Sequence, residues 1–141
     1  MLSVSADLDL VLVLGGDRVV VVPTTFEYSS ESPYAVTARF RTSDGDVQWV
    51  FGRDLLAEGL TGPAGEGDVT VWPSPGASGD DVVCLALESP SGGALLEADP
   101  LHVRGFLEDT YRLVPAGSES DLLDLDAEIA ALLGDDAAPL R

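Results

Sequence analysis

The stretch YAVTARFRTSDGDVQWVFGRDLLAEGL, from Tyr34 to Leu60, decides how the rest of the chain is read. Apolar and polar side chains alternate over its first eight residues. This alternation predicts a strand from Tyr34 to Arg41 with its arginines on one face and its larger apolar side chains on the other. Asp44-Gly45 then favours a tight hairpin, because glycine accepts the positive φ of such turns. The chain returns in a second strand, Val47–Phe51, whose alternate residues again share an apolar face.

A short helix is predicted directly after this hairpin. Residues 53–58 are good helix formers, and Gly59 stands where a left-handed C-terminal cap is expected. Two turns are marginal without tertiary contacts. We therefore expect Leu55, Leu56 and Leu60 to hold the helix by packing.

The same patterns extend over the remainder of the chain. Period-two or continuous apolar runs predict strands at 4–14, 18–22 (ended by Pro23), 25–28, 68–72 (ended by Pro73), 82–87 and 94–98. Apolar residues at steps of three and four predict a helix opening at Pro100 and continuing to Val114, and a second helix from Ser118 or Ser120 to Gly134. Gly105 inside the first of these helices predicts a close neighbour there.

Strands that follow one another through hairpins favour antiparallel pairing. Several strands, a helix, several strands and two helices indicate two strand-rich halves, each closed by a helix. The predicted fold class is therefore α+β, with antiparallel sheets. The length of 141 residues predicts a single domain, residues 1–134, followed by a flexible C-terminal tail, residues 135–141.

Charge limits the classes of partner. Twenty-five acidic residues face seven basic ones, for a formal net charge of −18, and all seven basic residues are arginine. A field of this sign opposes nucleic acid and anionic membranes.

A single cysteine excludes an internal disulfide. No signal peptide or membrane-spanning run is recognisable, so a soluble cytoplasmic protein without membrane insertion is predicted, whose partners are other proteins.

The residue types that carry chemistry do not form a recognisable site. Cys84 lies in an apolar strand, and His102 at the start of a helix has no third group to complete a nucleophilic arrangement. The glycine-rich loop from Gly59 to Asp68 lacks the Lys-Ser/Thr of a phosphate-binding loop and carries acidic residues. The acidic residues between 124 and 128 do not share one helix face. No catalytic residue, cofactor or metal is predicted.

Three residues are candidates for an interface. Trp72 is out of phase with Val69 and Val71 and precedes a proline, and tryptophan is frequent in protein contacts. Arg39 and Arg41 lie on the strand face opposite the aromatic residues, where they are predicted either to pair with internal carboxylates or to mark a subunit contact. Trp49 shares a face with Val47 and is expected in the core.

Several segments of the chain resemble a known family. They are SPYAV (32–36), VQWVFGRDLLAEGL (47–60), GDVTVWPS (67–74), VVCLALESPSGGALLEA (82–98) and FL with VPAGSE (106–119). Together they resemble the SsgA-like family of sporulation-specific cell division proteins of actinobacteria. The motif W-V-F-x-R-D-L-L-x-x-G-L, followed by V-x-V-W-P-S, is the most specific part of the match, which covers about residues 8–133.

The resemblance implies a function that composition alone does not give. Members of this family are associated with the tubulin-like division protein FtsZ and with SsgA. It implies a non-enzymatic adaptor that marks the septum in sporulating filaments and recruits FtsZ there. It also implies a whirly-like fold of two antiparallel sheets plus helices, assembled as a homotrimer. Whirly domains elsewhere bind single-stranded nucleic acid. We keep that activity only as an alternative, because this chain has no lysine and few arginines to line a backbone groove.

Overall fold

A computed structural model describes residues 2–65, 67–76 and 79–120. The strands are β1 (Ser3–Val13), β2 (Val19–Ser29), β3 (Ala35–Thr42), β4 (Gly45–Gly52), β5 (Val69–Pro75), β6 (Asp81–Ser89) and β7 (Gly92–Ala98). The helices are α1 (Arg53–Glu58) and α2 (Pro100–Leu113). The predicted second long helix beyond residue 120 and the predicted tail at 135–141 lie outside the described residues, so the domain boundary at residue 134 stays a prediction.

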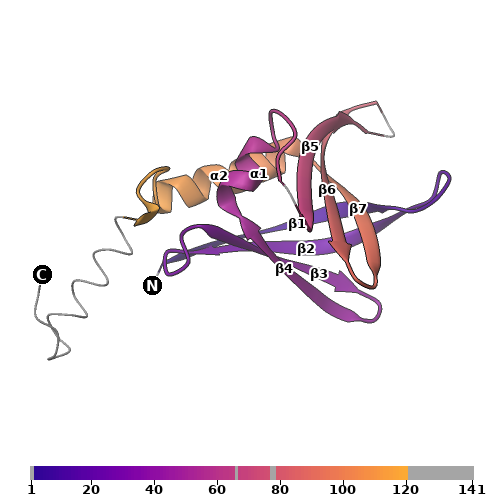
Figure 1. The fold of residues 1–141 in the computed structure, drawn as a ribbon, viewed down its shortest axis with the longest axis horizontal. Coiled ribbons are helices and arrows are strands. Elements are labelled where there is room, and N and C mark those ends of the chain that lie inside the picture. The colour runs from indigo at the N-terminus through magenta and orange to yellow at the C-terminus, as the bar shows by residue number, and fades with distance from the viewer. Residues whose placement is uncertain (1, 66, 77–78, 121–141) are drawn as a thin grey trace, which may run out of the picture.

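All seven strands belong to one antiparallel sheet with the order β4-β3-β2-β1-β7-β6-β5. The prediction of two sheets is therefore wrong. The two strand-rich halves are joined where β1 pairs with β7, through the partners Val11 with Glu97 and Leu12 with Leu96. In Figure 1, β5 and β6 run steeply across the direction of β1 to β4, so the single sheet is strongly curled, with α1 and α2 lying at one end of it.

One face of this curled sheet, here called the inner face, forms the core. Alternate residues of each strand point inward, as the sequence pattern predicts. Phe26 packs edge-to-face against Phe51 and Phe106, with ring centroids 6.2 Å and 5.5 Å apart. The fully buried inner-face residues include Leu10, Val36, Ala38, Val71 and Leu85. The predicted stripe of α2 is confirmed, because Val103, Phe106, Leu107 and Thr110 are buried against this face.

Two strands continue past the prolines that were expected to end them. Pro23 lies inside β2, opposite Asp9 of β1, but the ladder with β3 begins only at Thr24. The missing N–H of Pro23 thus falls just outside the second ladder. Pro73 and Pro75 lie in β5, which is the last strand of the sheet, where proline is tolerated.

Gly59 ends α1 for a different reason from the one predicted. Its φ of −66° is right-handed, so the left-handed cap is wrong. A Cβ at this position would stand 2.1 Å from Cγ1 of Val71, so only glycine lets the end of α1 approach β5. The close neighbour predicted at Gly105 is also wrong, because a Cβ there would meet nothing within 4 Å. Gly45, with φ of +117°, confirms the predicted hairpin turn.

Candidate interaction surfaces

The most constrained polar group in the described structure is Arg53, the first residue of α1, which is fully buried. Its Nη1 donates to the carbonyl oxygens of Thr110 at 3.1 Å and Val114 at 2.7 Å. Its Nη2 donates to Oε2 of Glu119 at 2.6 Å in a buried ion pair. These contacts join the end of β4 to the last turn of α2 and to the segment that follows it.

Two tyrosine rings enclose the same guanidinium, with centroids 4.8 Å (Tyr28) and 4.2 Å (Tyr111) from its Cζ. The hydrogen bond from Arg53 lowers the pKa of Glu119, as does the backbone N–H of Gly117, which donates to Oε1 at 3.0 Å. Burial raises the pKa of both tyrosines. We call these residues, together with Thr110 and Val114, the Arg53 cluster. Internal groups hold both Nη atoms of the guanidinium, and only its buried Nε lacks a partner among the described residues. The cluster therefore serves to connect structural elements.

Sequence reasoning missed this cluster. Arg53 was interpreted only as a good helix former, and arginine in a chain of net charge −18 is expected at the surface. Its carboxylate partner is 66 residues away along the chain. No local pattern connects the two, although the family motif does include Arg53.

The three predicted interface residues all lie on the outer face of the sheet but not in one patch. Arg39 pairs with Glu27 of β2 at 3.3 Å, which confirms the internal ion pair. Arg41 is exposed, and no salt bridge within 4 Å joins it to another residue in the described ranges. Trp72 is half-buried on β5, opposite Cys84. From β3 to β5 is five strand steps, which is a path of roughly 24 Å along the curled sheet at about 4.8 Å per step. Their role in partner contacts stays a prediction.

Cys84 and His102 do not form a reactive pair. Cys84 is buried, and burial together with the charge of Glu97 raises the pKa of its thiol. A raised pKa keeps the thiol protonated at neutral pH, which opposes a nucleophilic role. His102 is exposed on the first turn of α2. In the part of the chain that the structure describes, no group of three or more His, Cys, Asp or Glu side chains is placed to hold a metal ion.

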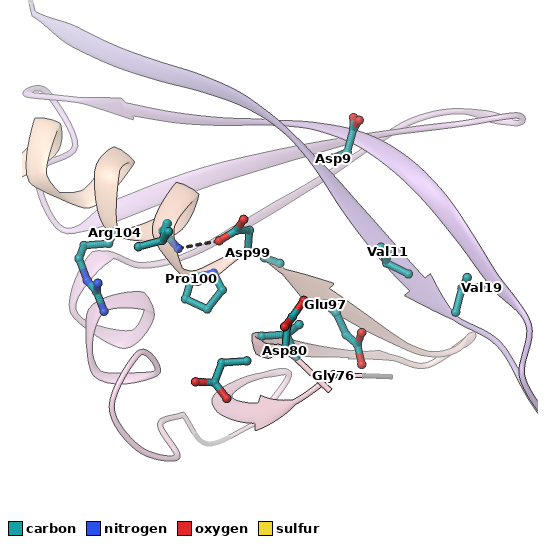
Figure 2. Close-up of a pocket in the computed structure, with 13 residues that line it drawn as sticks. Asp9, Val11, Val19, Gly76, Asp80, Glu97, Asp99, Pro100 and Arg104 are labelled. Carbon is teal, nitrogen blue, oxygen red and sulfur yellow. Dashed lines mark hydrogen bonds between the residues drawn. The ribbon is translucent and has the colours of Figure 1, made fainter. Parts of the chain in front are cut away.

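An acidic groove crosses the outer face where β1, β6 and β7 meet the start of α2. Its carboxylates are Asp9, Asp80, Asp81, Glu97 and Asp99, against one basic residue, Arg104. Figure 2 shows Asp9, Asp80, Glu97 and Asp99 around this groove, and shows the hydrogen bond by which Asp99 caps α2, from the N–H of Leu101 at 2.8 Å. Five carboxylates around one hollow oppose a phosphate backbone.

The tip of the β1–β2 hairpin carries exposed apolar side chains. Val19, Val20 and Val21 are 51%, 46% and 57% exposed. They pair with β1 alone, because β3 pairs only with the later residues 24–27 of β2. In Figure 1 this hairpin projects beyond the rest of the sheet. We call Val19–Val21 the valine tip. Three consecutive exposed valines on so acidic a chain favour an apolar protein contact.

The glycine-rich loop after α1 has a structural role. The N–H of Ala64 donates to the carbonyl of Val71 at 2.8 Å, and the N–H of Val71 donates back at 2.9 Å. The loop therefore pairs with part of the outer edge of β5 instead of forming a phosphate cradle. Across the described residues, no helix has the length and apolar character needed to cross a membrane.

Comparison with known proteins agrees with the resemblance of the sequence. The family model described as "Streptomyces sporulation and cell division protein, SsgA" matches residues 22–119. The sporulation-specific cell division protein SsgB of Frankia casuarinae is 49% identical over 132 residues, which are 93% of this chain and 92% of that protein. SsgB of Streptomyces coelicolor is 47% identical over 94% of this chain and 97% of its own length.

The fold agrees with solved structures as well. An SsgA-like sporulation-specific cell division protein from Thermobifida fusca superposes with a TM-score of 0.83 at 41% identity, covering 94% of this chain and 96% of that one. SsgB of Streptomyces coelicolor superposes with a TM-score of 0.82 at 48% identity, covering 86% and 95%. With the family model covering residues 22–119 and these relatives spanning nearly the whole length, this chain belongs to the SsgA family of sporulation and cell division proteins.

Proposed function

We propose that this protein is a non-enzymatic adaptor of cell division that helps to position the sporulation septum and recruits the tubulin-like protein FtsZ. The observation that carries the proposal is the identity of 47–49% to SsgB proteins named for sporulation-specific cell division, over more than nine-tenths of this chain. A cytoplasmic location at the septum belongs to the same proposal.

The surfaces described above support an adaptor over an enzyme. The one buried ion pair among the described residues joins structural elements. The thiol of Cys84 is buried and kept protonated. What the described surface offers is exposed apolar strand residues and a strongly acidic groove, which are features that bind polypeptides.

Assembly as a homotrimer is part of the proposal, and the valine tip is the surface we assign to it. The three valines are exposed and apolar, so burying them between copies would stabilise an assembly against the repulsion of the negatively charged chains. Sedimentation equilibrium should give three times the chain mass. Val20→Lys and Val21→Lys together should lower that mass, whereas a monomeric wild type would contradict the assignment.

Binding to FtsZ is tested with purified proteins. The chain should co-sediment with assembled FtsZ filaments, and a fluorescent fusion should form bands at future septa in sporulating filaments. No co-sedimentation at either low or moderate salt, together with a diffuse fusion, would overturn the proposal.

Single-stranded nucleic-acid binding is the alternative function. Fluorescence anisotropy of a labelled oligonucleotide at low salt should stay flat, because the acidic groove and the net charge of −18 repel phosphates. A rise in anisotropy that disappears with added salt would favour the alternative.

A further inference from the structure

We propose that the outer edge of β4 binds an extended segment of another protein, which adds to the sheet as an eighth strand. This inference deepens the proposed function, because it names the surface and the kind of segment through which the adaptor acts. All eight residues of β4 pair with β3 on one side. Within the described ranges no strand pairs with its other side, because β4 is the first strand in the sheet order.

The direction of the backbone groups on β4 follows from one hydrogen bond. The N–H of Arg53 donates to the carbonyl of Tyr34 at 2.8 Å, at the end of the β3–β4 ladder. Hydrogen-bonded and non-hydrogen-bonded pairs alternate along an antiparallel ladder. Counting back from Arg53 in steps of two residues, Phe51, Trp49 and Val47 exchange backbone hydrogen bonds with β3. The residues between them, Gln48 and Val50, therefore direct their backbone N–H and C=O groups outward.

This edge lacks the devices that normally protect a strand edge. Natural edges are blocked by proline, by lysine, by bulges or by a covering loop. Residues 47–52 of β4 carry no charge and no proline, and the ladder with β3 runs without a bulge. Val47 and Val50 are 44% and 56% exposed. The edge is thus a ready template for β-strand addition.

An apolar pocket of about 230 Å³ opens beside the same edge. It lies on the inner face, between the β3–β4 hairpin and the β6–β7 hairpin, which end close together in Figure 1. No charged residue lines it, and its apolar walls are Leu12, Val22, Phe40, Val47, Trp49, Leu87, Ala94 and Leu96. A strand added to β4 would lie next to Val47 and Trp49, which line this pocket. Its inward-facing apolar side chains would then extend the apolar surface that these two residues begin, since strand side chains alternate between faces.

The negative charge of this chain indicates which kind of segment binds at the β4 edge. The chain carries a net charge of −18, and Asp44 and Asp46 outnumber Arg41 at the turn end of β4. A second copy of this chain would bring a second strongly negative field to the edge. The segment that fits best belongs to a different protein. It is extended, alternates apolar residues, and carries lysine or arginine at the end that meets the β3–β4 turn.

The test uses the full chain and a phage-displayed library of random twelve-residue peptides. Selected peptides, synthesised and labelled, should alternate apolar residues and carry a basic end. Val50→Pro removes an outward N–H and leaves the β3 ladder intact, so it should weaken their binding tenfold or more. Val50→Thr keeps the N–H and the branched shape, and should bind within about twofold of the wild type, as expected for a surface substitution.

Circular dichroism and thermal unfolding establish that each variant is folded. If Val50→Pro does not fold, Gln48→Pro removes another outward N–H, and Val47→Lys places a charge at the pocket wall. Equal binding of the selected peptides to these variants and to the wild type would overturn the proposal. A selection that enriches no peptide with alternating apolar residues would also overturn it. A fall in oligomer mass caused by Val50→Pro would instead assign the edge to a second copy and overturn the chosen occupant.

Purified FtsZ separates this inference from the proposed function. If FtsZ binds the wild type and Val50→Pro equally, recruitment stands and β4 is not its docking edge. If FtsZ binds neither the wild type nor Val50→Pro, while the selected peptides bind only the wild type, docking at β4 is supported and FtsZ recruitment is overturned.

Discussion

The two edges of the sheet differ in how they are protected. At β5, prolines at 73 and 75 remove backbone donors, and the loop after α1 pairs Ala64 with Val71. Gly59 lets the end of α1 lie directly against the same strand. At β4, nothing among the described residues covers the outward groups of Gln48 and Val50. One edge is closed and the other is open, beside a pocket without charge.

This difference indicates at which edge the single curled sheet can add another strand. An unprotected edge is a hazard that natural proteins usually remove. Protection at β5 and its absence at β4 within one molecule indicate that the open edge is used. The two edges are supported at opposite ends of α1, because the Arg53 cluster holds its start at the end of β4 and Gly59 lets its other end approach β5. Substitutions at these two ends compare the supports of the two edges.

The largest expected effect is on the support of β4. Arg53→Met leaves the carboxylate of Glu119 buried without its partner, which costs about 3–5 kcal/mol of unfolding free energy. Urea denaturation measures this loss. Glu119→Gln keeps a hydrogen-bond acceptor and is the milder control. A loss of less than about 1 kcal/mol for Arg53→Met, the range typical of exposed pairs, would show that the cluster does not anchor the strand.

The same cluster predicts a pH dependence. The pKa of Glu119 is lower in the folded chain than its ordinary value, chiefly because of the hydrogen bond from Arg53. Its contribution to stability is therefore present above the unfolded pKa, about 4.3, and is lost as pH falls through the lower folded pKa. The stability difference between wild type and Glu119→Gln should shrink below about pH 4.3. A constant difference from pH 7 to pH 3 would contradict the assignment.

The next effect is on the cover of β5. Gly59→Ala places a Cβ 2.1 Å from Cγ1 of Val71 and should cost about 1–3 kcal/mol through overpacking. Gly105→Ala is the matched control, because its Cβ meets nothing within 4 Å inside α2, and it should gain about 0.5–1 kcal/mol. Thermal and urea unfolding of both variants compare the two glycines directly. Equal effects in the two variants would show that the approach of α1 to β5 is not tight.

The smallest effect is expected for the outer face. Arg39 and Glu27 form a partly exposed ion pair, which contributes about 0–1 kcal/mol. Arg39→Ala should thus leave the unfolding free energy nearly unchanged in denaturant titrations at moderate salt. A loss above about 2 kcal/mol, well beyond the range of exposed pairs, would mean that this face is part of the support of β4.

Local patterns predicted the elements better than their assembly. The alternation in residues 34–51 predicted the β3–β4 hairpin and its inner face, and the helical stripe predicted α2. The single sheet escaped prediction because it depends on two register pairs between β1 and β7, which lie more than 80 residues apart in the sequence. The predicted strands ended too early at their prolines. A proline interrupts a ladder only where its missing N–H faces a neighbouring strand, and the sequence does not show on which side a neighbour lies.

The candidate surfaces were predicted less completely. Arg39 was correctly expected in an ion pair, and Trp72 on a face opposite Val71. The open edge of β4 depends on strand order, which no residue of β4 encodes. Trp49 was expected in the core, and it is half-buried where it lines the pocket beside that edge. Trp49 lies between the core and the pocket because the sheet is curled, and this curl is not predictable from the sequence alone.

Amide hydrogen exchange tests the open edge most directly. The amides of Gln48 and Val50 should exchange quickly in the free protein and become protected when a selected strand peptide is bound, while Val47 and Trp49, already bonded to β3, should change little. Protection that appears on β5, on α2 or on the valine tip, with Gln48 and Val50 still exchanging quickly, would contradict docking at β4.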